Sequence, residues 1–467
     1  MHYVSSRGGA PALGFEDVLL AGLARDGGLY LPARYPALDP DRIAAMADRP
    51  YAEVAAEVMA PFVGDAFEIA ALRRIAAEVY AGFDDPAVAP LRDLGRGHWL
   101  MELFHGPTLA FKDFALQFLG RLFAIVLDRR GARATIIGAT SGDTGSAAIA
   151  GVRGLDAVDI FILYPEGRVS EVQRRQMTTV ADRNVHAVAI QGTFDDCQAL
   201  VKAMFNDLAL RDALHLAAVN SINWARVMAQ IVYYVTAWTR LGAPAEGVSF
   251  SVPTGNFGDV FAGYVAKRMG LPVGRLIVAT NRNDILARFL ASGEYRKSEV
   301  EPTLSPSMDI GVASNFERLL FEIHDRDPDR VSALMAELER DGGFRVADPA
   351  LARTRADFTA ARIDEADCLA AIAKTWRQHH ILIDPHTAVA LAAARRLRLD
   401  HETVVTLGTA HAAKFPDAVA RATGVRPDLP PHLADLYERP ERMVVLPNDP
   451  VRVQEFVRTH ARIAAPA

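Results

Sequence analysis

Residues 247–270, "GVSFSVPTGNFGDVFAGYVAKRMG", combine two kinds of pattern in one short stretch. The opening run, "GVSFSVP", is rich in the residues that favour a buried strand. After a glycine-containing turn, "GNFGDVFAGYVAKRMG" spaces its apolar residues as an amphipathic helix does. The stretch therefore predicts a strand that passes through a glycine-containing turn into a helix.

This strand–helix unit recurs along the chain. Strand-like runs occupy residues 134–140, 159–165, 185–192 and 403–409, with helical patterns between them, and "LHLAAVN" and "RLIVATN" add two more. Strands that alternate with helices at this spacing form parallel βαβ units with helices on both faces of the sheet. The pattern predicts an α/β fold.

The first part of the chain has a different pattern. Residues 1–92 are mostly helical in their periodicity, and a connection rich in proline and glycine covers residues 84–95. We predict an N-terminal domain over 1–92 and a second, α/β region over 93–467. Two stretches rich in alanine and arginine, 350–363 and 387–400, are expected to be solvated helices.

Composition excludes several classes of function. The chain has 467 residues, 50% hydrophobic and 23% charged, with a formal net charge of −6, so nothing favours a nucleic-acid partner. No signal peptide and no apolar run long enough to span a bilayer is visible, which predicts no membrane partner. The two cysteines have no disulfide or metal-site spacing, so we expect a cytoplasmic protein without a metal.

The turn after residue 253 is a candidate anion site. Gly255 and Gly258 are expected to take positive φ and to let the backbone approach a ligand closely. Successive N–H groups and the positive end of the following helix then suit a phosphate. The alternative is a strand-to-helix turn that binds nothing.

A second turn of this kind is "GATSGDTGSAA", residues 138–148. Its glycine, serine and threonine residues also precede a helix, and two such nests suit a ligand with two anionic ends, or two ligands. The alternative is ordinary N-capping of the helix by Ser141 and Thr144.

Lys112 lies inside the apolar stretch "LFHGPTLAFKDFALQFLG", residues 103–120. Burial disfavours the charged ammonium and leaves a nucleophilic amine, which is what a Schiff-base lysine needs. Together with a phosphate nest, Lys112 points to pyridoxal phosphate. In "TVVTLGTAHAAKF", the Thr409 hydroxyl could face the pyridine nitrogen. The alternatives are a lysine whose stem packs on the core and a threonine that caps a helix.

The chain resembles threonine synthases of the longer type found in fungi and many bacteria. The likeness runs nearly end to end and is carried by "YVSSRG", "GLARDGGLYLP", "ELFHGPTLAFKDFA", "GATSGDTGSAA", "NSINWARVMAQIVYY", "PTGNFGDVFAGY" and "TLGTAHAAKF". The resemblance implies a fold-type II pyridoxal-phosphate enzyme of the tryptophan-synthase-β-like group. Its α/β fold would have two doubly wound parallel-sheet subdomains, a mostly helical N-terminal domain and a C-terminal helical extension.

The same resemblance implies roles for particular residues. Lys112 would carry pyridoxal 5′-phosphate and act in catalysis. The cofactor would be bound by Lys112, Gly255, Asn256, Phe257, Gly258, Asp259 and Thr409. The substrate would be bound by Ser141, Asp143, Thr144, Asn223 and Arg226. For the last two, the alternative is a helix capped by Asn220 or Ser221 with Arg226 on its solvated face.

The implied activity is conversion of O-phospho-L-homoserine and water to L-threonine and phosphate, a β,γ-replacement and the last step of threonine biosynthesis. Two alternatives stay open. One is a related phospholyase that releases a 2-oxo acid, and the other is a protein that binds pyridoxal phosphate without catalysis. The resemblance also implies a monomer.

Overall fold

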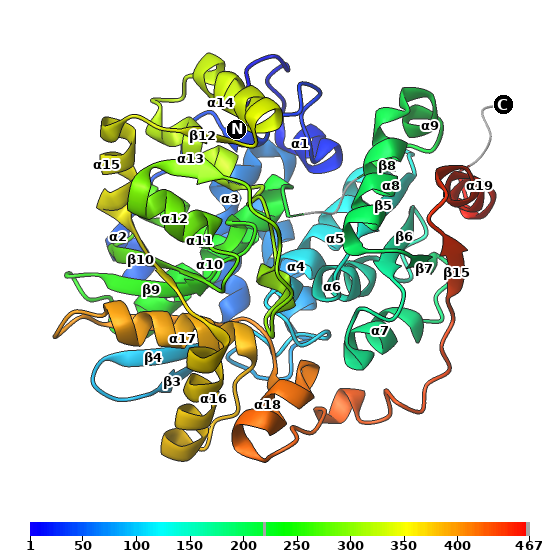
Figure 1. Ribbon diagram of the computed structural model, residues 1–467. Helices are drawn as coiled ribbons and strands as arrows, with labels where there is room; N and C mark the ends of the chain where they lie inside the picture. Colours follow the sequence, from blue (N-terminus) through cyan, green and yellow to red (C-terminus); the bar gives the residue numbers. More distant parts are fainter. Residues whose placement is uncertain (218–220, 464–467) are drawn as a thin grey trace. The chain divides into compact units, whose positions relative to one another are not determined.

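The computed structural model describes residues 1–217 and 221–463. Its contacts divide the chain into two units. The first unit comprises residues 1–18, 23–115 and 221–427, and the second comprises residues 19–22, 116–220 and 428–467. Figure 1 shows that each unit is built around its own sheet. The predicted division at residue 92 stays a prediction.

The N-terminal part of the chain is mostly helical, as its periodicity predicts. Two short antiparallel strands pair here, β1 (Tyr3–Ser5) with β2 (Tyr30–Pro32). On α4, the residues at helical spacing, such as Leu72, Ile75 and Val79, are the buried ones. The helices of this part are α1 (Phe15–Ala21), α2 (Pro40–Ala44), α3 (Tyr51–Val63), the 3₁₀ turn η1 (Gly64–Ala66) and α4 (Ile69–Tyr80).

The sheet of the first unit has six strands. In spatial order they are β13 (Phe358–Arg362), β10 (Val273–Thr280), β9 (Val248–Pro253), β14 (Val404–Gly408), β4 (His98–Glu102) and β3 (Leu91–Asp93). Every pairing is parallel except that of β3 with β4. Two antiparallel strands outside this sheet, β11 (Glu294–Arg296) and β12 (Gly343–Arg345), pair with each other.

Helices cover both faces of this sheet, because neighbouring strand residues point to opposite sides. Ile277 of β10 belongs to a buried cluster with Leu391 of α17, whereas Phe250 of β9 stacks edge-on against Tyr234 of α10 at 4.8 Å. The helices of the unit are α10 (Trp224–Arg240), α11 (Gly258–Arg268), α12 (Ile285–Ser292), η2 (Pro306–Met308), α13 (Phe316–Ile323), α14 (Pro328–Asp341), α15 (Asp348–Asp357), α16 (Glu365–His379), α17 (Pro385–Leu397), η3 (Ala412–Lys414) and α18 (Pro416–Thr423).

The sheet of the second unit is wholly parallel. Its order is β15 (Val444–Pro447), β7 (Val185–Gln191), β6 (Val158–Pro165), β5 (Ala134–Ala139) and β8 (Leu216–Ala217). Phe161 and Leu163 of β6 pack with residues of α8 and α19 on one face. The helices are α5 (Lys112–Arg129), whose first turn belongs to the first unit, α6 (Asp143–Val152), α7 (Glu171–Thr178), α8 (Phe194–Asn206), α9 (Leu208–Ala213), η4 (Pro431–Leu433) and α19 (Pro450–His460). Two doubly wound parallel sheets confirm the predicted fold class.

Two expectations about helices are wrong. Within 350–363, residues 358–362 form β13, because Phe358 is buried and the segment pairs with β10. Within 387–400, α17 ends at Leu397 and most of it is buried. Its alanines are small enough to let the helix pack closely on β9, β10 and β14. Of the predicted strand "LHLAAVN", β8 covers 216–217, and residues 218–220 lie outside the described part.

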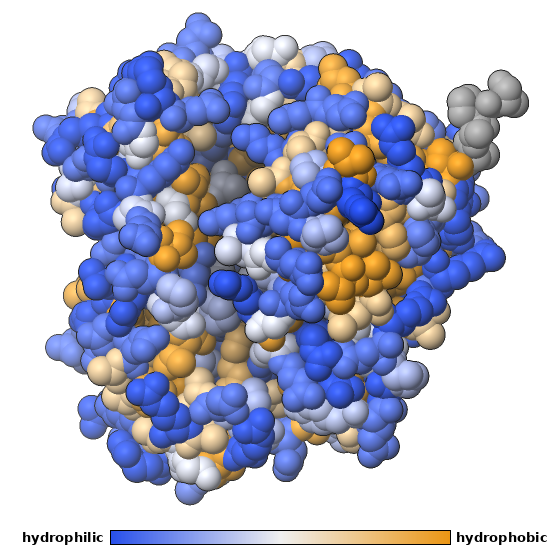
Figure 2. All heavy atoms as spheres, turned by 45° about the vertical axis from the view of Figure 1, so that its right-hand side comes forward, coloured by the Kyte–Doolittle hydropathy of each residue, from blue (hydrophilic) through white to orange (hydrophobic). Residues whose placement is uncertain are grey.

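Within the part of the chain that the structure describes, no helix is long and apolar enough to cross a membrane. Both cysteines, Cys197 and Cys368, are free and buried. Hydrophilic residues predominate over much of the face in Figure 2, with hydrophobic residues gathered on one part of it. Among the exposed hydrophobic side chains are Val444 and Val445 of β15. This strand lies at the edge of its sheet, and its shortness limits further pairing.

Candidate active site

Lys112 is the first residue of α5 and directly follows a loop that is stabilised by several hydrogen bonds. The Asp113 carboxylate accepts hydrogen bonds from the Thr108 N–H at 2.8 Å and the Thr108 hydroxyl at 2.7 Å. The ammonium of Lys414, which is wholly buried, donates to the Thr108 carbonyl at 2.7 Å. Lys112 is 8% exposed, so its amine is held largely away from bulk water.

The Lys112 loop is joined to the end of β14, where Thr409 lies. The Phe111 N–H donates to the Thr409 carbonyl at 2.9 Å, and Ala110 forms an antiparallel bridge with Ala410. The structure therefore brings together Lys112 and Thr409, which are far apart in sequence. Thr409 is not a helix cap, since His411 caps η3 by accepting from the Ala413 N–H at 3.1 Å.

The glycine loop between β9 and α11 has the predicted place but not the predicted dihedrals. Positive φ falls on Phe257, at 64°, and on neither Gly255 nor Gly258. Gly255 is needed for space instead, because a Cβ built there would lie 2.7 Å from the Ser307 carbonyl oxygen. The expectation of positive φ at the glycines is wrong. Close approach of the loop to a ligand stays a prediction.

The loop fits a phosphate by its donors. The main-chain N–H groups of Gly255, Asn256, Phe257, Gly258 and Asp259 have no hydrogen-bond acceptor among the described residues. A carbonyl of the loop is also hydrogen-bonded, since the Asn315 N–H donates to the Asn256 carbonyl at 3.0 Å. Consecutive free amides at the start of a helix form a cradle for an anion such as a cofactor phosphate.

The side chain of Asp259 is turned into the protein. Its Oδ1 accepts hydrogen bonds from the hydroxyls of Tyr233 at 2.5 Å and Tyr234 at 3.0 Å, and its Oδ2 is buried without a partner. Burial raises the pKa of Asp259 from 3.8 to about 6, although the hydroxyl donors and the charge of Lys112 favour the ionised form. The main chain of Asp259 is thus part of the loop, whereas its side chain is a buried carboxyl whose raised pKa favours the protonated form.

The raised pKa makes the effect of Asp259 on stability depend on pH. The folded protein binds a proton more tightly than the unfolded chain between pH 3.8 and about 6. The cost of burying the charge therefore appears as pH rises through this range and is complete above it. For apoprotein, we expect Asp259→Asn to be more stable than wild type by about 3 kcal/mol at pH 8 and equal to it near pH 4.

Urea unfolding of both apoproteins at several pH values measures this difference. Asp156→Asn is a matched control of opposite sign, because Arg183 lowers the pKa of this exposed carboxyl. That variant should gain no stability at pH 8. A stability difference for Asp259→Asn that did not change with pH would contradict the prediction.

The crowding at Gly255 predicts a loss of cofactor binding on substitution. In Gly255→Ala the new methyl would press on the Ser307 main chain, so the loop would have to shift away from the position predicted to bind phosphate. At Gly258 a Cβ would lie 3.2 Å from the Asn315 side-chain nitrogen, a less severe contact than that at Gly255. We expect at least about tenfold weaker pyridoxal phosphate binding in Gly255→Ala and a much smaller effect in Gly258→Ala. Equilibrium titration of the apoproteins measures both, and equal affinities would contradict the prediction.

Ser141, Asp143 and Thr144 lie in the second unit, at the start of α6. The expected alternative, capping by Ser141 and Thr144, is wrong, because Thr140 Oγ1 accepts the N–H groups of Gly142 at 3.0 Å and Gly145 at 2.9 Å. Gly142 has φ of 139°, which favours glycine. A role of these three residues toward substrate stays a prediction.

Asn223 and Arg226 lie in the first turn of α10 and have different surroundings. Asn223 is the cap, accepting the Ala225 N–H at 3.0 Å. Capping by Ser221 is therefore wrong, and Asn220 lies outside the described residues. The alternative also placed Arg226 on the solvated face of the helix, and this is wrong because the side chain is buried. It is 4% exposed, and among the residues that the structure describes its Nε and Nη1 have no hydrogen-bond partner.

Desolvation lowers the pKa of Arg226 to about 10, and no carboxylate counteracts it. Arg318 in the same unit is also buried, with its pKa lowered to about 10, but its guanidinium donates to the carbonyls of Tyr30 and Ile222. Arg226 is thus a buried cation that retains donors for an anion.

One part of the site was not predicted from sequence. The Lys112 ammonium lies 3.5 Å from the Ser307 hydroxyl, and the Ser307 N–H donates to His386 Nε2 at 3.1 Å. His386 Nδ1 in turn contacts the Asp384 carboxylate at 2.6 Å. These residues come from three distant segments, so no spacing in the sequence links them. The only local signal is the helix start "DPHT", residues 384–387.

Comparison with known proteins identifies the family. Models described as "Threonine synthase N terminus", "Pyridoxal-phosphate dependent enzyme" and "Threonine synthase, C-terminal" match residues 2–80, 86–342 and 387–457. A threonine synthase of Pseudomonas aeruginosa is 55% identical over 468 residues, which cover 100% of both chains.

The chain belongs to the threonine synthase family.

Solved structures of threonine synthases agree with this membership. A pyridoxal-phosphate-bound threonine synthase from Brucella melitensis is 54% identical, with a TM-score of 0.96, and the match covers 99% of this chain and 100% of that one. The yeast threonine synthase is 38% identical, with a TM-score of 0.92 over 98% of both chains. The predicted family, enzyme class and cofactor are confirmed.

Proposed function

We propose that this protein is a threonine synthase that converts O-phospho-L-homoserine and water to L-threonine and phosphate, the last step of threonine biosynthesis. One observation carries the proposal. The loop before Lys112 is hydrogen-bonded to Thr409, and both lie in the same unit as a glycine loop whose main-chain N–H groups have no acceptor among the described residues. Membership of the threonine synthase family over the full chain supports the reaction.

Pyridoxal 5′-phosphate would be held by residues of the first unit. Lys112 would bind its aldehyde carbon, and Thr409 would face the pyridine nitrogen. The phosphate would be bound by the main chain of Gly255, Asn256, Phe257, Gly258 and Asp259, in accord with their free N–H groups. The cofactor supplies an electron sink for negative charge at the substrate α-carbon.

The chain's own residues supply binding and proton transfer. Lys112 Nζ takes the α-proton and returns protons later, which its partial burial supports by disfavouring the ammonium. Arg226 binds an anionic group of the substrate with its unpartnered donors. Ser141, Asp143, Thr144 and Asn223 are proposed to help hold the same substrate.

Product identity tests the proposal. Purified enzyme with pyridoxal phosphate and O-phospho-L-homoserine should release phosphate and threonine in equal amounts. A phospholyase would release 2-oxobutyrate and ammonia instead, and a binding protein without catalysis would release no phosphate. Either result would overturn the proposal, and amino-acid analysis with a 2-oxo-acid assay separates the three outcomes.

Two further proposals concern the location and the assembly of the enzyme. Two free, buried cysteines suit a reducing compartment, so we propose a cytoplasmic enzyme. We also propose a monomer without a nucleic-acid or membrane partner, on the resemblance and on the net charge of −6. Light scattering of the purified protein measures the assembly.

A further inference from the structure

Ser307 lies at a point where three parts of the first unit meet. Its hydroxyl is 3.5 Å from Lys112 Nζ, and its carbonyl approaches Gly255 so closely that a Cβ there would lie 2.7 Å away. Its N–H donates to His386 at 3.1 Å. One residue thus touches the cofactor lysine, the glycine loop and the first turn of α17.

The bond to His386 fixes the state of the imidazole. A main-chain N–H can only donate, so His386 Nε2 must be the unprotonated acceptor. The ring proton is then on Nδ1, where it faces the Asp384 carboxylate at 2.6 Å. Asp384 is wholly buried and His386 is 3% exposed, so the pair binds the Ser307 main chain out of contact with bulk water.

The same turn of α17 also supports the other end of the cofactor site. Asp384 Oδ1 accepts the Thr387 N–H at 3.0 Å, and the Thr387 hydroxyl accepts the Thr409 N–H at 3.2 Å. The turn that holds Ser307 therefore holds Thr409 as well. A shift of this turn would move both Lys112's neighbour and the residue proposed to face the pyridine nitrogen.

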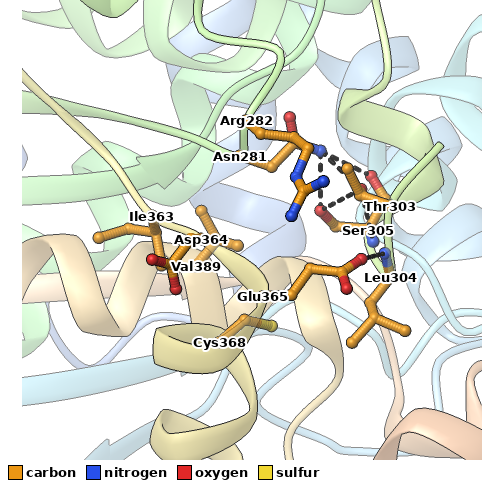
Figure 3. A pocket seen from close by; sticks show the side chains of 10 residues that line it. All are labelled: Asn281, Arg282, Thr303, Leu304, Ser305, Ile363, Asp364, Glu365, Cys368 and Val389. Atoms are coloured by element: carbon orange, nitrogen blue, oxygen red, sulfur yellow. Dashed lines mark hydrogen bonds between the residues drawn. The ribbon is translucent and has the colours of Figure 1, made fainter. Parts of the chain in front are cut away.

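The segment that carries Ser307 is anchored from two further sides. Asn281 Nδ2 donates to the Ser305 hydroxyl at 3.0 Å, and Glu365 accepts the Leu304 N–H at 3.2 Å. Figure 3 shows these hydrogen bonds around the pocket beside the segment. So many polar bonds to one short segment specify its position closely.

A lysine that moves protons needs such a fixed neighbour. When its amine is free, Lys112 has a flexible stem of four carbons and N–H groups that require an acceptor. The contact of 3.5 Å is at the long end of the hydrogen-bond range, and contacts of this kind tighten when the reacting groups are bound.

We propose that Ser307 is a positioning residue for Lys112, and that His386 and Asp384 fix Ser307 in place. The hydroxyl accepts a hydrogen bond from Lys112 Nζ and keeps the amine directed at the atoms between which it moves protons. The proposal rests on the assignment of Lys112 as the cofactor lysine.

The first test follows attachment of the cofactor, which needs no substrate. Apoprotein is mixed with pyridoxal phosphate, and the visible absorbance reports the bond that forms between Lys112 Nζ and the aldehyde carbon with loss of one water. Loss of one hydrogen bond to a charged group predicts attachment about tenfold slower in Ser307→Ala. Ser307→Thr keeps the hydroxyl and should restore most of the rate. Ser292→Ala removes an exposed serine hydroxyl and serves as the matched control.

The second test concerns the support. His386→Gln keeps an acceptor near the position of Nε2, whereas His386→Leu removes it, so the leucine variant should attach the cofactor about tenfold more slowly and the glutamine variant should not. Equal rates in these two variants would overturn the role of His386. The thermal midpoint of each apoprotein is measured alongside.

Threonine formation gives the third readout, in which Ser307→Ala should lower kcat and leave KM near the wild-type value. An attachment rate and kcat both within twofold of wild type in Ser307→Ala would overturn the proposal. So would equal losses in Ser307→Ala and Ser307→Thr with lowered thermal midpoints, which indicate a structural role only. If wild type makes no threonine, the proposed function fails, but the attachment rates still decide the role of Ser307.

Discussion

Lys112→Ala is expected to lose covalent attachment of pyridoxal phosphate and to lower threonine formation by at least about 10⁴-fold, since the variant lacks the amine that we propose as both nucleophile and proton carrier. Wild-type protein should be yellow, and borohydride should fix the cofactor on Lys112. The variant should fold normally, because Ala favours the helix that begins at this position.

Two other lysines of the first unit serve as controls. Lys414 Nζ donates to the Thr108 carbonyl at 2.7 Å, and Lys267 Nζ lies 2.8 Å from the Asp357 carboxylate. Both amines are bound to strong acceptors, which makes them poor nucleophiles. Lys267→Ala should keep the yellow colour and the activity. If mass spectrometry located the reduced cofactor on Lys267 or Lys414, the assignment of Lys112 would be wrong.

Much of the fold could be predicted because its signals are local. The strands β5, β6, β7, β9, β10 and β14 all begin within two residues of predicted runs. Their helices follow from apolar residues at helical spacing. The strand β13 was missed because "FTAAR" has no strong strand signal of its own and is fixed by pairing with β10. The burial of α17 was missed for a similar reason, since alanine is compatible with either surface or core.

Sequence could predict only those residues of the candidate site that follow a strand or lie in a characteristic loop. Lys112, the glycine loop and Thr409 each follow a strand or a characteristic loop, so the ends of parallel strands bring them into one unit. The contact of Ser307 with Lys112 joins residues 195 positions apart, and no sequence pattern reports it. Gly255 was identified for the wrong reason, because the structure requires its small size and not a positive φ.

The hydrogen-bond partners of a buried arginine such as Arg226 cannot be predicted from the sequence. Its place on α10 was predictable, whereas the lack of a partner for its Nε and Nη1 within the described part of the chain depends on packing from the whole unit. Arg318 differs from Arg226, because its Nε and Nη2 donate to the main-chain carbonyls of Tyr30 and Ile222 and it therefore has a structural role. Unpaired buried donors of this kind are costly and rare in proteins.

Replacing Arg226 is therefore expected to have opposite effects on stability and on substrate binding. Without ligand the fold bears the cost of a buried charge at pH 7, since the guanidinium is still protonated well below a pKa of about 10. The shift from 12.5 corresponds to about 3 kcal/mol. Arg226→Met should thus unfold at a higher urea concentration than wild type, whereas Arg318→Met should unfold at a lower one, because it leaves buried carbonyls without donors.

Substrate binding should suffer in the same Arg226→Met variant. Loss of a charge-assisted contact to an anion costs roughly 1.5–3 kcal/mol, so KM for O-phospho-L-homoserine should rise about 10- to 100-fold. In protein saturated with pyridoxal phosphate, inorganic phosphate should raise the thermal midpoint of wild type and not of the variant, because a ligand stabilises only the fold that binds it. Cofactor content and visible absorbance should stay near wild type. If the variant instead lost pyridoxal phosphate, Arg226 would bind the cofactor, and if its kinetics were unchanged, Arg226 would bind neither.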